Sequence, residues 1–404
     1  MKTPRTLQYL IVWHLCDEWR GCTSIDSCFK SICGDAMRLR ATLMFSGLCS
    51  VVGMVALASC AVAGAQDIPV LQDAKPRYVF LPGKPGPTPP PPVVLKTWNG
   101  SFIHAGVTYP FTMVGSAPAT GTSTTVAAII IPLKIIVQNS GVPVTFDPKH
   151  VLPDGNTVNK ATAISPIFDK TTNYTQGAVN LGTTQYIDAF QRGNLWGTVS
   201  LHPGYHVLLG GPTFRAEQTL NVPASEGIEA NAFGANVAVV NINWFDSEIQ
   251  TLLPKLVAPN QIGIFLTYDT YLSDNSGLSG CCIGGYHSYT GTQAYIEATY
   301  VDQVGAFAQD VSALSHEVGE FVDDPFGSNF VPTACGFGAV LEVGDPEEGF
   351  VNYGAFPYTV NGFSYNLQDL VFLPYFGAPT SRSVNGWLTF QGNPFGLSFC
   401  SNGG

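Results

Sequence analysis

The residues best suited to chemistry lie in the stretch ALSHEVGEFVDDP at positions 313–325. His316 and Glu320 are four residues apart, so on a helix they lie one turn apart on the same face. An imidazole nitrogen and a carboxylate oxygen placed in this way can bind one divalent cation together. Glu317 follows His316 directly and is placed to act as a general base on water beside that cation. The spacing therefore predicts a metal site with Glu317 as the catalytic residue.

The third ligand has to come from another part of the chain, because a catalytic zinc site uses three protein ligands and keeps one position open. The segment LEVGDPEEG at 341–349 offers Glu342 and Asp345. Glu342 as the ligand, with Asp345 orienting the histidine, resembles the gluzincin arrangement, and the reverse assignment is the alternative. We expect one zinc ion per chain, although a site so rich in carboxylates would also accept manganese or calcium.

A metal-free interpretation also has to be considered, because acidic residues on the polar face of a helix are usually only solvated. Only 12% of the residues in this chain are charged, whereas about 25% is typical. Several carboxylates gathered on one otherwise apolar helix are unexpected in such a chain. This scarcity of charge favours the metal site.

The remaining histidines show weaker patterns. His202 and His206 are also four residues apart, but Pro203 and the glycine after it prevent the helix that would bring them together. His287 lies in the glycine-rich segment GLSGCCIGGYHSYTG, where a hydrogen-bonded loop histidine is the ordinary interpretation and a ligand or substrate-side role is the alternative.

The candidate ligands would be positioned by a helix and a neighbouring strand. Apolar residues recur every three or four positions from Val304 to Val322, with Asp302 as a possible N-cap and Pro325 as the stop. The segment TQAYIEATYV at 292–301 alternates as a strand does. We expect this strand to lie at a sheet edge, where an extended peptide could pair with it.

Most of the remaining chain predicts β-structure. Strands are expected in TSTTVAAIIIPLKIIVQN, NVAVVNINWF and QIGIFLTYDTYLS, and a short helix in DSEIQTLLPKL at 246–256. The fold class is therefore α+β, a β-rich body with a zincin-like active-site helix next to an edge strand. We expect one domain at 96–404, in which 96–259 is the β-rich half and 260–404 the metal-site half.

The N-terminal part predicts export. Residues 37–65 have the basic start, apolar centre and small-residue end of a signal peptide cleaved after Ala65. A lipid anchor at Cys60 is the alternative. The preceding residues 1–36 are interpreted as a misannotated extension, and the proline-rich 66–95 as a spacer. The protein would then be secreted, periplasmic or attached to the cell surface, without a membrane span.

Four cysteines remain after such processing, which are Cys281, Cys282, Cys335 and Cys400. An even number in an exported chain predicts two disulfides, with buried free thiols as the alternative. We expect Cys281 and Cys282 each to bond a distant cysteine rather than each other. The net charge of −11 argues against a nucleic-acid partner, and a monomer is expected.

Three short motifs show a family resemblance. GYHSYTG, DDPFGSNF and VNGFSYNLQDLVFLP, which occur in this order, make about residues 260–376 similar to the Exordium-like, phosphate-induced secreted proteins of plants and their microbial relatives. Microbial members carry a His-Glu-x-x-Glu segment ending in Asp-Pro, followed by Glu-x-x-Asp. The matching positions here are His316, Glu317, Glu320, Asp324, Pro325, Glu342 and Asp345. The resemblance implies an exported protein with a metallopeptidase-like core. The resemblance carries over no disulfide pairing, because the microbial pattern has a cysteine soon after its aspartate, whereas here Pro346 follows Asp345 and Cys335 precedes it.

Together, these patterns predict an exported metal-dependent hydrolase, with a peptidase acting on polypeptides as the favoured class. The alternative is a non-catalytic secreted or cell-surface binding protein, whose carboxylates hold a structural cation or none.

Overall fold

The computed structural model describes residues 68–391 except 87–90, 92, 140, 275–277, 334–337, 379–382 and 385–386. All of these residues belong to a compact unit, Asp67–Gly404. The predicted signal peptide with Cys60, the extension before it, Cys335 and Cys400 lie outside the described residues.

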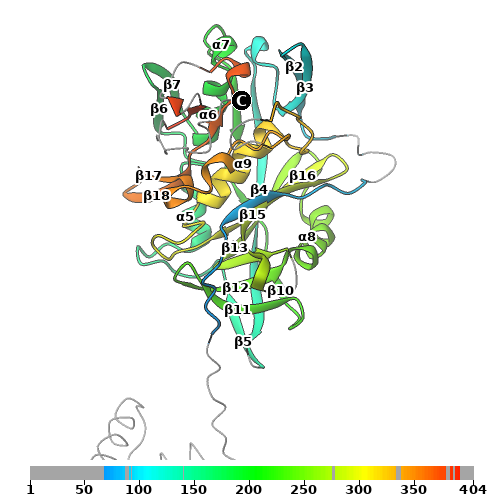
Figure 1. Ribbon diagram of the computed structural model, residues 1–404, viewed down its shortest axis with the longest axis vertical. Coiled ribbons are helices and arrows are strands. Elements are labelled where there is room, and N and C mark those ends of the chain that lie inside the picture. Colours follow the sequence, from blue (N-terminus) through cyan, green and yellow to red (C-terminus); the bar gives the residue numbers. More distant parts are fainter. Residues whose placement is uncertain are drawn as a thin grey trace, which may run out of the picture. The chain divides into compact units, whose positions relative to one another are not determined.

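The body is built on a mixed sheet of 12 strands (Figure 1). Its main path runs β10-β4-β13-β16-β15-β14-β12-β11, while β5, β8 and β9 pair with β4 and β1 pairs with β15. The strands are β1 (Arg77–Phe80), β4 (Ser123–Asn139), β5 (Val142–Phe146), β8 (His206–Leu209), β9 (Thr213–Phe214), β10 (Gln218–Asn221), β11 (Gly227–Ala232), β12 (Ala235–Asn241), β13 (Gln261–Tyr268), β14 (Thr270–Ser273), β15 (Cys281–Thr290) and β16 (Gln293–Tyr300). The predicted β-rich α+β fold is confirmed.

Smaller sheets and short helices surround this sheet. The further strands are β2 (Thr97–His104), β3 (Val107–Val114), β6 (Thr172–Gln176), β7 (Val179–Thr184), β17 (Ala355–Val360), β18 (Phe363–Gln368), β19 (Val371–Phe372), β20 (Ser383–Val384) and β21 (Trp387–Thr389). The helices are α5 (Val158–Ala163), α6 (Tyr186–Asn194), α7 (Trp196–Val199), α8 (Ile242–Leu256) and α9 (Ser312–Asp323), with 3-10 turns η1 (Pro118–Thr120), η2 (Leu278–Gly280), η3 (Asp345–Glu347), η4 (Val351–Gly354) and η5 (Pro374–Phe376). None of the described helices is long and apolar enough to cross a bilayer.

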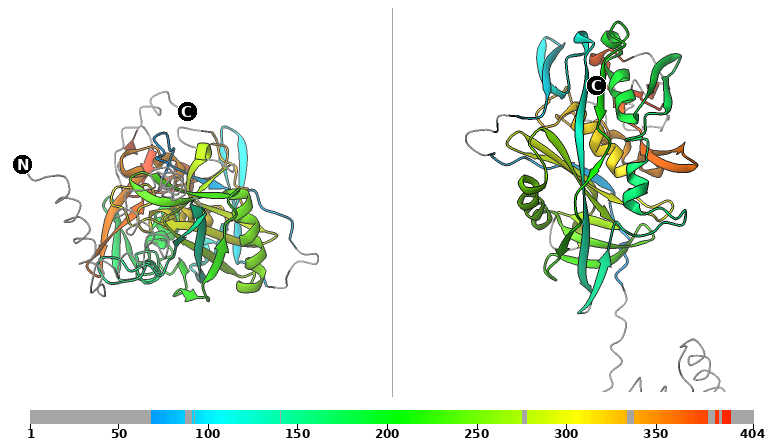
Figure 2. Two further views of the ribbon diagram at one scale, coloured as in Figure 1. Left: turned by 90° about the horizontal axis from the view of Figure 1, so that it is seen from below. Right: turned by 180° about the vertical axis from the view of Figure 1, so that it is seen from behind.

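The 17-residue strand β4 joins the two predicted halves of the domain. Its β-branched run pairs in parallel with β13 over Ala127–Pro132, so a strand before residue 259 forms the core together with one after it. Figure 2 shows β4, in teal, running lengthwise through the body. The two halves therefore share one sheet and one hydrophobic core.

The strand predicted at 261–273 is two strands in the structure. Asp269 has a positive φ of 43°, which a continuous strand cannot contain. After this residue β14 leaves the neighbours of β13 and pairs with β12 and β15 instead. The apolar run is continuous because both pieces are buried, and for that reason the pattern does not reveal the break.

Helix α9 is shorter than predicted. It begins at Ser312, whereas the prediction from Asp302 and Val304 placed about two more turns before it. Ala308 and Asp310 have φ values of 56° and 46°, and this left-handed backbone cannot continue a helix. The residues between 304 and 311 include buried apolar side chains held in an irregular turn, which mimic the helical period. The predicted end is confirmed, because the helix stops at Asp323, two residues before Pro325.

The predicted edge strand at 292–301 lies inside the sheet. It forms β16, which pairs with β13 on one side and β15 on the other. Its eight residues are all buried, because the sheet covers it from both sides. The prediction that this strand pairs with a peptide is therefore wrong.

Part of the predicted proline-rich spacer belongs to the sheet. Residues 77–80 form β1, which pairs in parallel with β15. This short run lies between Pro76 and Pro82 and carries Tyr78, Val79 and Phe80, so it has both backbone donors and apolar side chains. The spacer interpretation is wrong for this segment, and β1 lies directly beside the candidate site.

The cysteine pairing also differs from the prediction. Cys281 and Cys282 form a disulfide with each other, within the buried start of β15. We expected distant partners because a bond between adjacent cysteines departs from the usual disulfide geometry. The peptide bond between these two residues is cis, and their sulfur atoms meet.

Candidate metal centre

Helix α9 carries three of the predicted site residues into the interior. It packs against β15 and β16 on one side and against β18, α6 and β3 on others. His316, Glu317 and Glu320 are consequently 0–1% exposed. The solvated acidic face, which was the metal-free interpretation, is wrong for this helix. Buried carboxylates need a compensating partner.

The loop after residue 340 brings the predicted third ligand to α9. The backbone N–H of Gly344 donates to Glu320 Oε1 at 3.2 Å, and η3 begins at the next residue, Asp345. This close approach requires a glycine, because a Cβ on Gly344 would lie 2.5 Å from Cε1 of His316. The pairing of the helix with a later acidic loop was thus predicted correctly.

His316, Glu320 and Asp345 form a group whose ligand atoms all lie within 4.8 Å of one another. His316 Nε2 is 3.0 Å from Glu320 Oε1 and 3.5 Å from Asp345 Oδ1. Around a tetrahedral ion with bonds of about 2.0–2.2 Å, neighbouring ligand atoms lie roughly 3.3–3.6 Å apart. The 3.5 Å distance lies in this range and the 3.0 Å distance is slightly shorter, while the two carboxylate oxygens lie within 4.8 Å of each other, so the three groups are close enough to share one cation.

The hydrogen bonding of His316 supports this interpretation. Despite the 3.0 Å distance, Glu320 does not lie in hydrogen-bonding geometry, and neither ring nitrogen of His316 has a hydrogen-bond partner in the described part of the chain. A buried imidazole without partners is costly and unusual. Asp345, by contrast, has a side chain 37% exposed, so one side of the group is open to water.

Glu342, the other predicted ligand, interacts with Glu320 and is not part of the group around His316. Both of its carboxylate oxygens are buried without a hydrogen-bond partner. Burial, and then the charge of Glu320, raise the pKa of Glu342 well above its usual value. Of the two alternatives for the third ligand, the structure brings Asp345 to the imidazole, and it brings Glu342 to the carboxylate next to it.

A second group shares Glu320 and adds His287, for which the sequence offered a ligand or substrate-side role as the alternative to a hydrogen-bonded loop histidine. His287 of β15 places Nδ1 3.3 Å from Glu317 Oε2 and 3.5 Å from Glu320 Oε2. Burial, and then the proximity of His316, lower the pKa of His287 to about 3. The ring is therefore neutral at ordinary pH, and its Nδ1–H can hold Glu317. The sequence gave no periodic signal for this contact, because β15 and α9 meet only in the tertiary structure.

The site concentrates negative charge. Burial, and then the charge of Glu320, raise the pKa of Glu317 well above its usual value, while burial and Asp345 do the same for Glu320. Glu348, in the same loop, has its pKa raised to about 7 by burial and by Asp345. Described positive side chains do not pair with Glu317, Glu320 or Asp345 apart from the histidines. A divalent cation would offset this repulsion.

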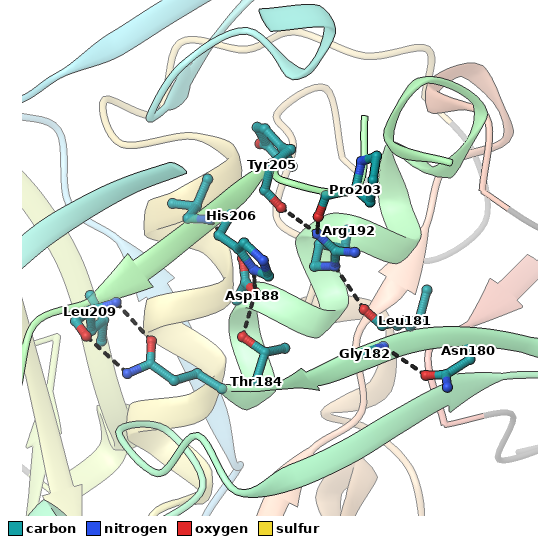
Figure 3. Close-up of polar contacts among 12 residues, drawn as sticks. Asn180, Leu181, Gly182, Thr184, Asp188, Arg192, Pro203, Tyr205, His206 and Leu209 are labelled. Carbon is teal, nitrogen blue, oxygen red and sulfur yellow. Dashed lines mark hydrogen bonds and ion pairs between the residues drawn. The ribbon is translucent and has the colours of Figure 1, made fainter. Parts of the chain in front are cut away.

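Another histidine shows what a structural role looks like in this protein (Figure 3). His206 Nδ1 lies 2.7 Å from Asp188 Oδ2, and Asp188 also accepts hydrogen bonds from Thr184 Oγ1 and the backbone N–H of Val207. Both carboxylate oxygens of Asp188 have hydrogen-bond partners, so these contacts have a structural role in which they link α6 to β8. His316 lacks such partners, which separates the two cases.

Tyr78 of β1 covers His316. Its ring stacks on that of His316 with centroids 3.9 Å apart, and its backbone N–H donates to Glu348 Oε2 at 2.9 Å. Tyr78 is 3% exposed. Neither contact was predicted, because the proline-rich sequence around Tyr78 gave no indication that it enters the sheet.

Comparisons with known proteins add no further constraint: no family model matches the chain, and none of the curated proteins or solved structures searched is significantly similar to it. The class of site therefore has to be argued from its geometry alone, which is that of a buried His-carboxylate cluster on a helix, closed by a carboxylate loop.

Proposed function

We propose that this protein is an exported metal-dependent hydrolase of the peptidase class, in which His316, Glu320 and Asp345 hold one divalent cation. The exported character comes from the signal-like sequence before residue 66, and the resemblance to Exordium-like secreted proteins is consistent with it. Zinc is the first candidate for the ion, with manganese or calcium as alternatives for so anionic a donor set.

The single observation that carries the proposal is the imidazole of His316. It is completely buried and has no hydrogen-bond partner among the described residues, yet two carboxylate oxygens lie 3.0 and 3.5 Å from Nε2. A protein gains nothing from this arrangement unless something binds between these atoms. A cation satisfies all three ligands together.

Glu317 is proposed as the general base. It lies next to His316 in the chain and its Oε1 has no hydrogen-bond partner, while Oε2 is held by His287. A carboxylate with a raised pKa, held by a neutral imidazole on one oxygen and free on the other, is suited to take and return a proton. A bound divalent cation supplies Lewis-acid activation of a carbonyl group and of water.

Elemental analysis and two substitutions test the proposal. The purified protein should contain about one divalent metal per chain, and His316→Ala should lose it. Glu317→Gln should retain the metal and lower hydrolysis of a mixed peptide library by about 10²–10⁴-fold. His206→Ala is the matched control, because that histidine contacts Asp188 and belongs to neither group of candidate metal ligands. A protein free of metal under all loading conditions would refute the proposal.

A non-catalytic metal-binding protein is the second candidate, and one observation favours it. With β1 in place, Tyr78 covers His316, so a substrate carbonyl has no direct approach over that ring. Metal binding at His316 without hydrolysis by the wild-type chain, and without gain of hydrolysis when β1 is displaced, would establish this alternative.

A further inference from the structure

Residues 75–84, called the N-terminal segment below, run along β15 over most of the length of that strand. Lys75 exchanges backbone hydrogen bonds with Cys281 and Cys282, β1 pairs from Ile283 to His287, and Lys84 exchanges hydrogen bonds with Tyr289 and Gly291. In Figure 1 this blue segment passes in front of the sheet beside β15. The other edge of β15 is occupied by β16.

The edge of β15 opposite β16 is covered only by the N-terminal segment over most of its length. Strand β14 pairs with β15 only at its beginning, at Cys281 and Ile283. Backbone groups between Cys281 and Gly291 bond to the N-terminal segment, and β1 pairs with no strand other than β15 among the described residues. Without β1, β15 would offer the pairing surface that peptides use in β-strand addition.

The side chains of β1 point at the residues of the candidate site. Tyr78 stacks on His316, and Phe80 lies with its ring centroid 5.1 Å from that of His287. The backbone of Tyr78 is held by Glu348 Oε2. Strand pairing, an aromatic contact and a carboxylate contact thus converge on one residue directly over the proposed metal ligand.

The attachment of the segment is limited by its own sequence. Pro76, Pro82 and Pro85 have no backbone N–H, so the regular ladder is restricted to 77–80. Of these four residues only Tyr78 is fully buried. An internal strand would be held from both sides, whereas this one resembles a bound peptide that happens to be covalently linked.

We propose that residues 75–84 act as an intramolecular occupant of a peptide-binding edge on β15, and that this edge receives extended polypeptides with an aromatic side chain over His316. This inference rests on the proposed function, in which the residues around His316 bind a metal ion and act on polypeptides. It names the substrate class, and it explains why Tyr78 covers His316 in the full chain.

A peptide-binding experiment tests this directly. In the full chain, residues 87–90 are replaced by the recognition sequence of a site-specific protease, so that the segment can be cut from the body without removing it. The probe is a fluorescein-labelled synthetic peptide of residues 74–84. Fluorescence polarisation should show at least tenfold tighter binding to the cut chain than to the uncut chain, because the cut segment can exchange with the probe.

Two comparisons make the result specific. A probe with alanine at the position of Tyr78 should bind at least tenfold more weakly. In the uncut chain, Tyr78→Ala should increase probe binding, while Tyr109→Ala, which alters the aromatic pair of Tyr109 on β3 with Phe102 on β2, should not. Amide hydrogen exchange at Gly291, whose N–H donates to the carbonyl oxygen of Lys84, should be faster in the cut chain than in the uncut chain.

The outcomes separate this inference from the proposed function. Probe binding that depends on Tyr78, without metal or hydrolysis, supports the peptide-binding edge and refutes the hydrolase. Equal binding to cut and uncut chains, or no probe binding by a cut chain that retains its circular dichroism, refutes the edge whether or not the protein binds metal. If the cut chain unfolds, equal probe binding by uncut wild type and by folded Tyr78→Ala also refutes it.

Discussion

Replacing Gly344 by alanine should weaken metal binding without removing any ligand. The added Cβ would lie 2.5 Å from Cε1 and 2.9 Å from Cγ of His316. Carbon atoms in contact prefer about 3.5–4.0 Å, so the ring or the loop has to move by roughly 1 Å. The backbone of Gly344, with φ of −94°, accepts alanine without strain, so the effect comes from this contact alone.

The size of the loss in metal affinity follows from the contacts of Gly344 with His316 and Glu320. The same movement changes the His316–Asp345 distance and the hydrogen bond from Gly344 to Glu320. Disturbing the residues that orient metal ligands typically costs about 10–100-fold in affinity. We expect zinc affinity to fall within that range, and overpacking to lower the free energy of unfolding by about 1–3 kcal/mol.

The assay is a competition titration of metal-free protein with zinc against a chromophoric chelator, followed by thermal unfolding with and without zinc. Gly349→Ala is the control, since a Cβ at this exposed glycine of the same loop meets no atom within 4 Å. Unchanged zinc affinity in a folded Gly344→Ala protein would refute the close approach of loop and imidazole on which the metal site depends.

Three further predictions concern ligands, metal removal and pH. Asp345→Asn should weaken zinc binding by roughly tenfold more than Glu342→Gln, measured in the same titration, because Asp345 is the carboxylate beside His316; the reverse order would assign the third ligand to Glu342. Chelation should lower the melting temperature of wild type by the equivalent of about 3 kcal/mol at metal concentrations 100 times Kd, and should leave His316→Ala unchanged; equal shifts in both would place the metal elsewhere. Burial raises the pKa of Asp323 to about 8, so its contribution to stability is complete below about pH 4 and is lost as the pH rises through 8. Between about pH 5 and 8, the free energy of unfolding should therefore fall less in Asp323→Asn than in wild type. The difference should be about 1.4 kcal/mol for each unit by which the pKa of Asp323 in the folded state exceeds that in the unfolded state. Denaturant titrations that show the same pH dependence for both proteins would contradict this.

The candidate site was partly predictable because some of its geometry is local. The i, i+4 spacing of His316 and Glu320 places them on one helical turn wherever that helix forms. The acidic loop at 342–345 was identifiable as a source of a third ligand from residue types alone. The choice between Glu342 and Asp345 was not, because it depends on how closely Gly344 approaches the imidazole.

The errors in the fold prediction arise from residues whose environment is non-local. Apolar residues before Ser312 are buried in an irregular turn, so burial imitates a helical period. The strand at 293–300 is interior because β15 and β13 flank it, and nothing in its own alternation distinguishes an edge from a centre. Likewise, no local rule places Arg77–Phe80 of a proline-rich stretch in a sheet.

The sequence by itself determined which side chains could bind a cation and that they share one turn of helix, since both follow from covalent order and helical pitch. Only the tertiary structure decided that this turn is fully buried, that His287 and Asp345 reach it from a strand and a loop, and that Tyr78 covers it. Those contacts join residues from 29 positions apart, for His316 and Asp345, to 238 positions apart, for Tyr78 and His316. Their energies depend on desolvation, which is a property of the packed protein and not of any segment.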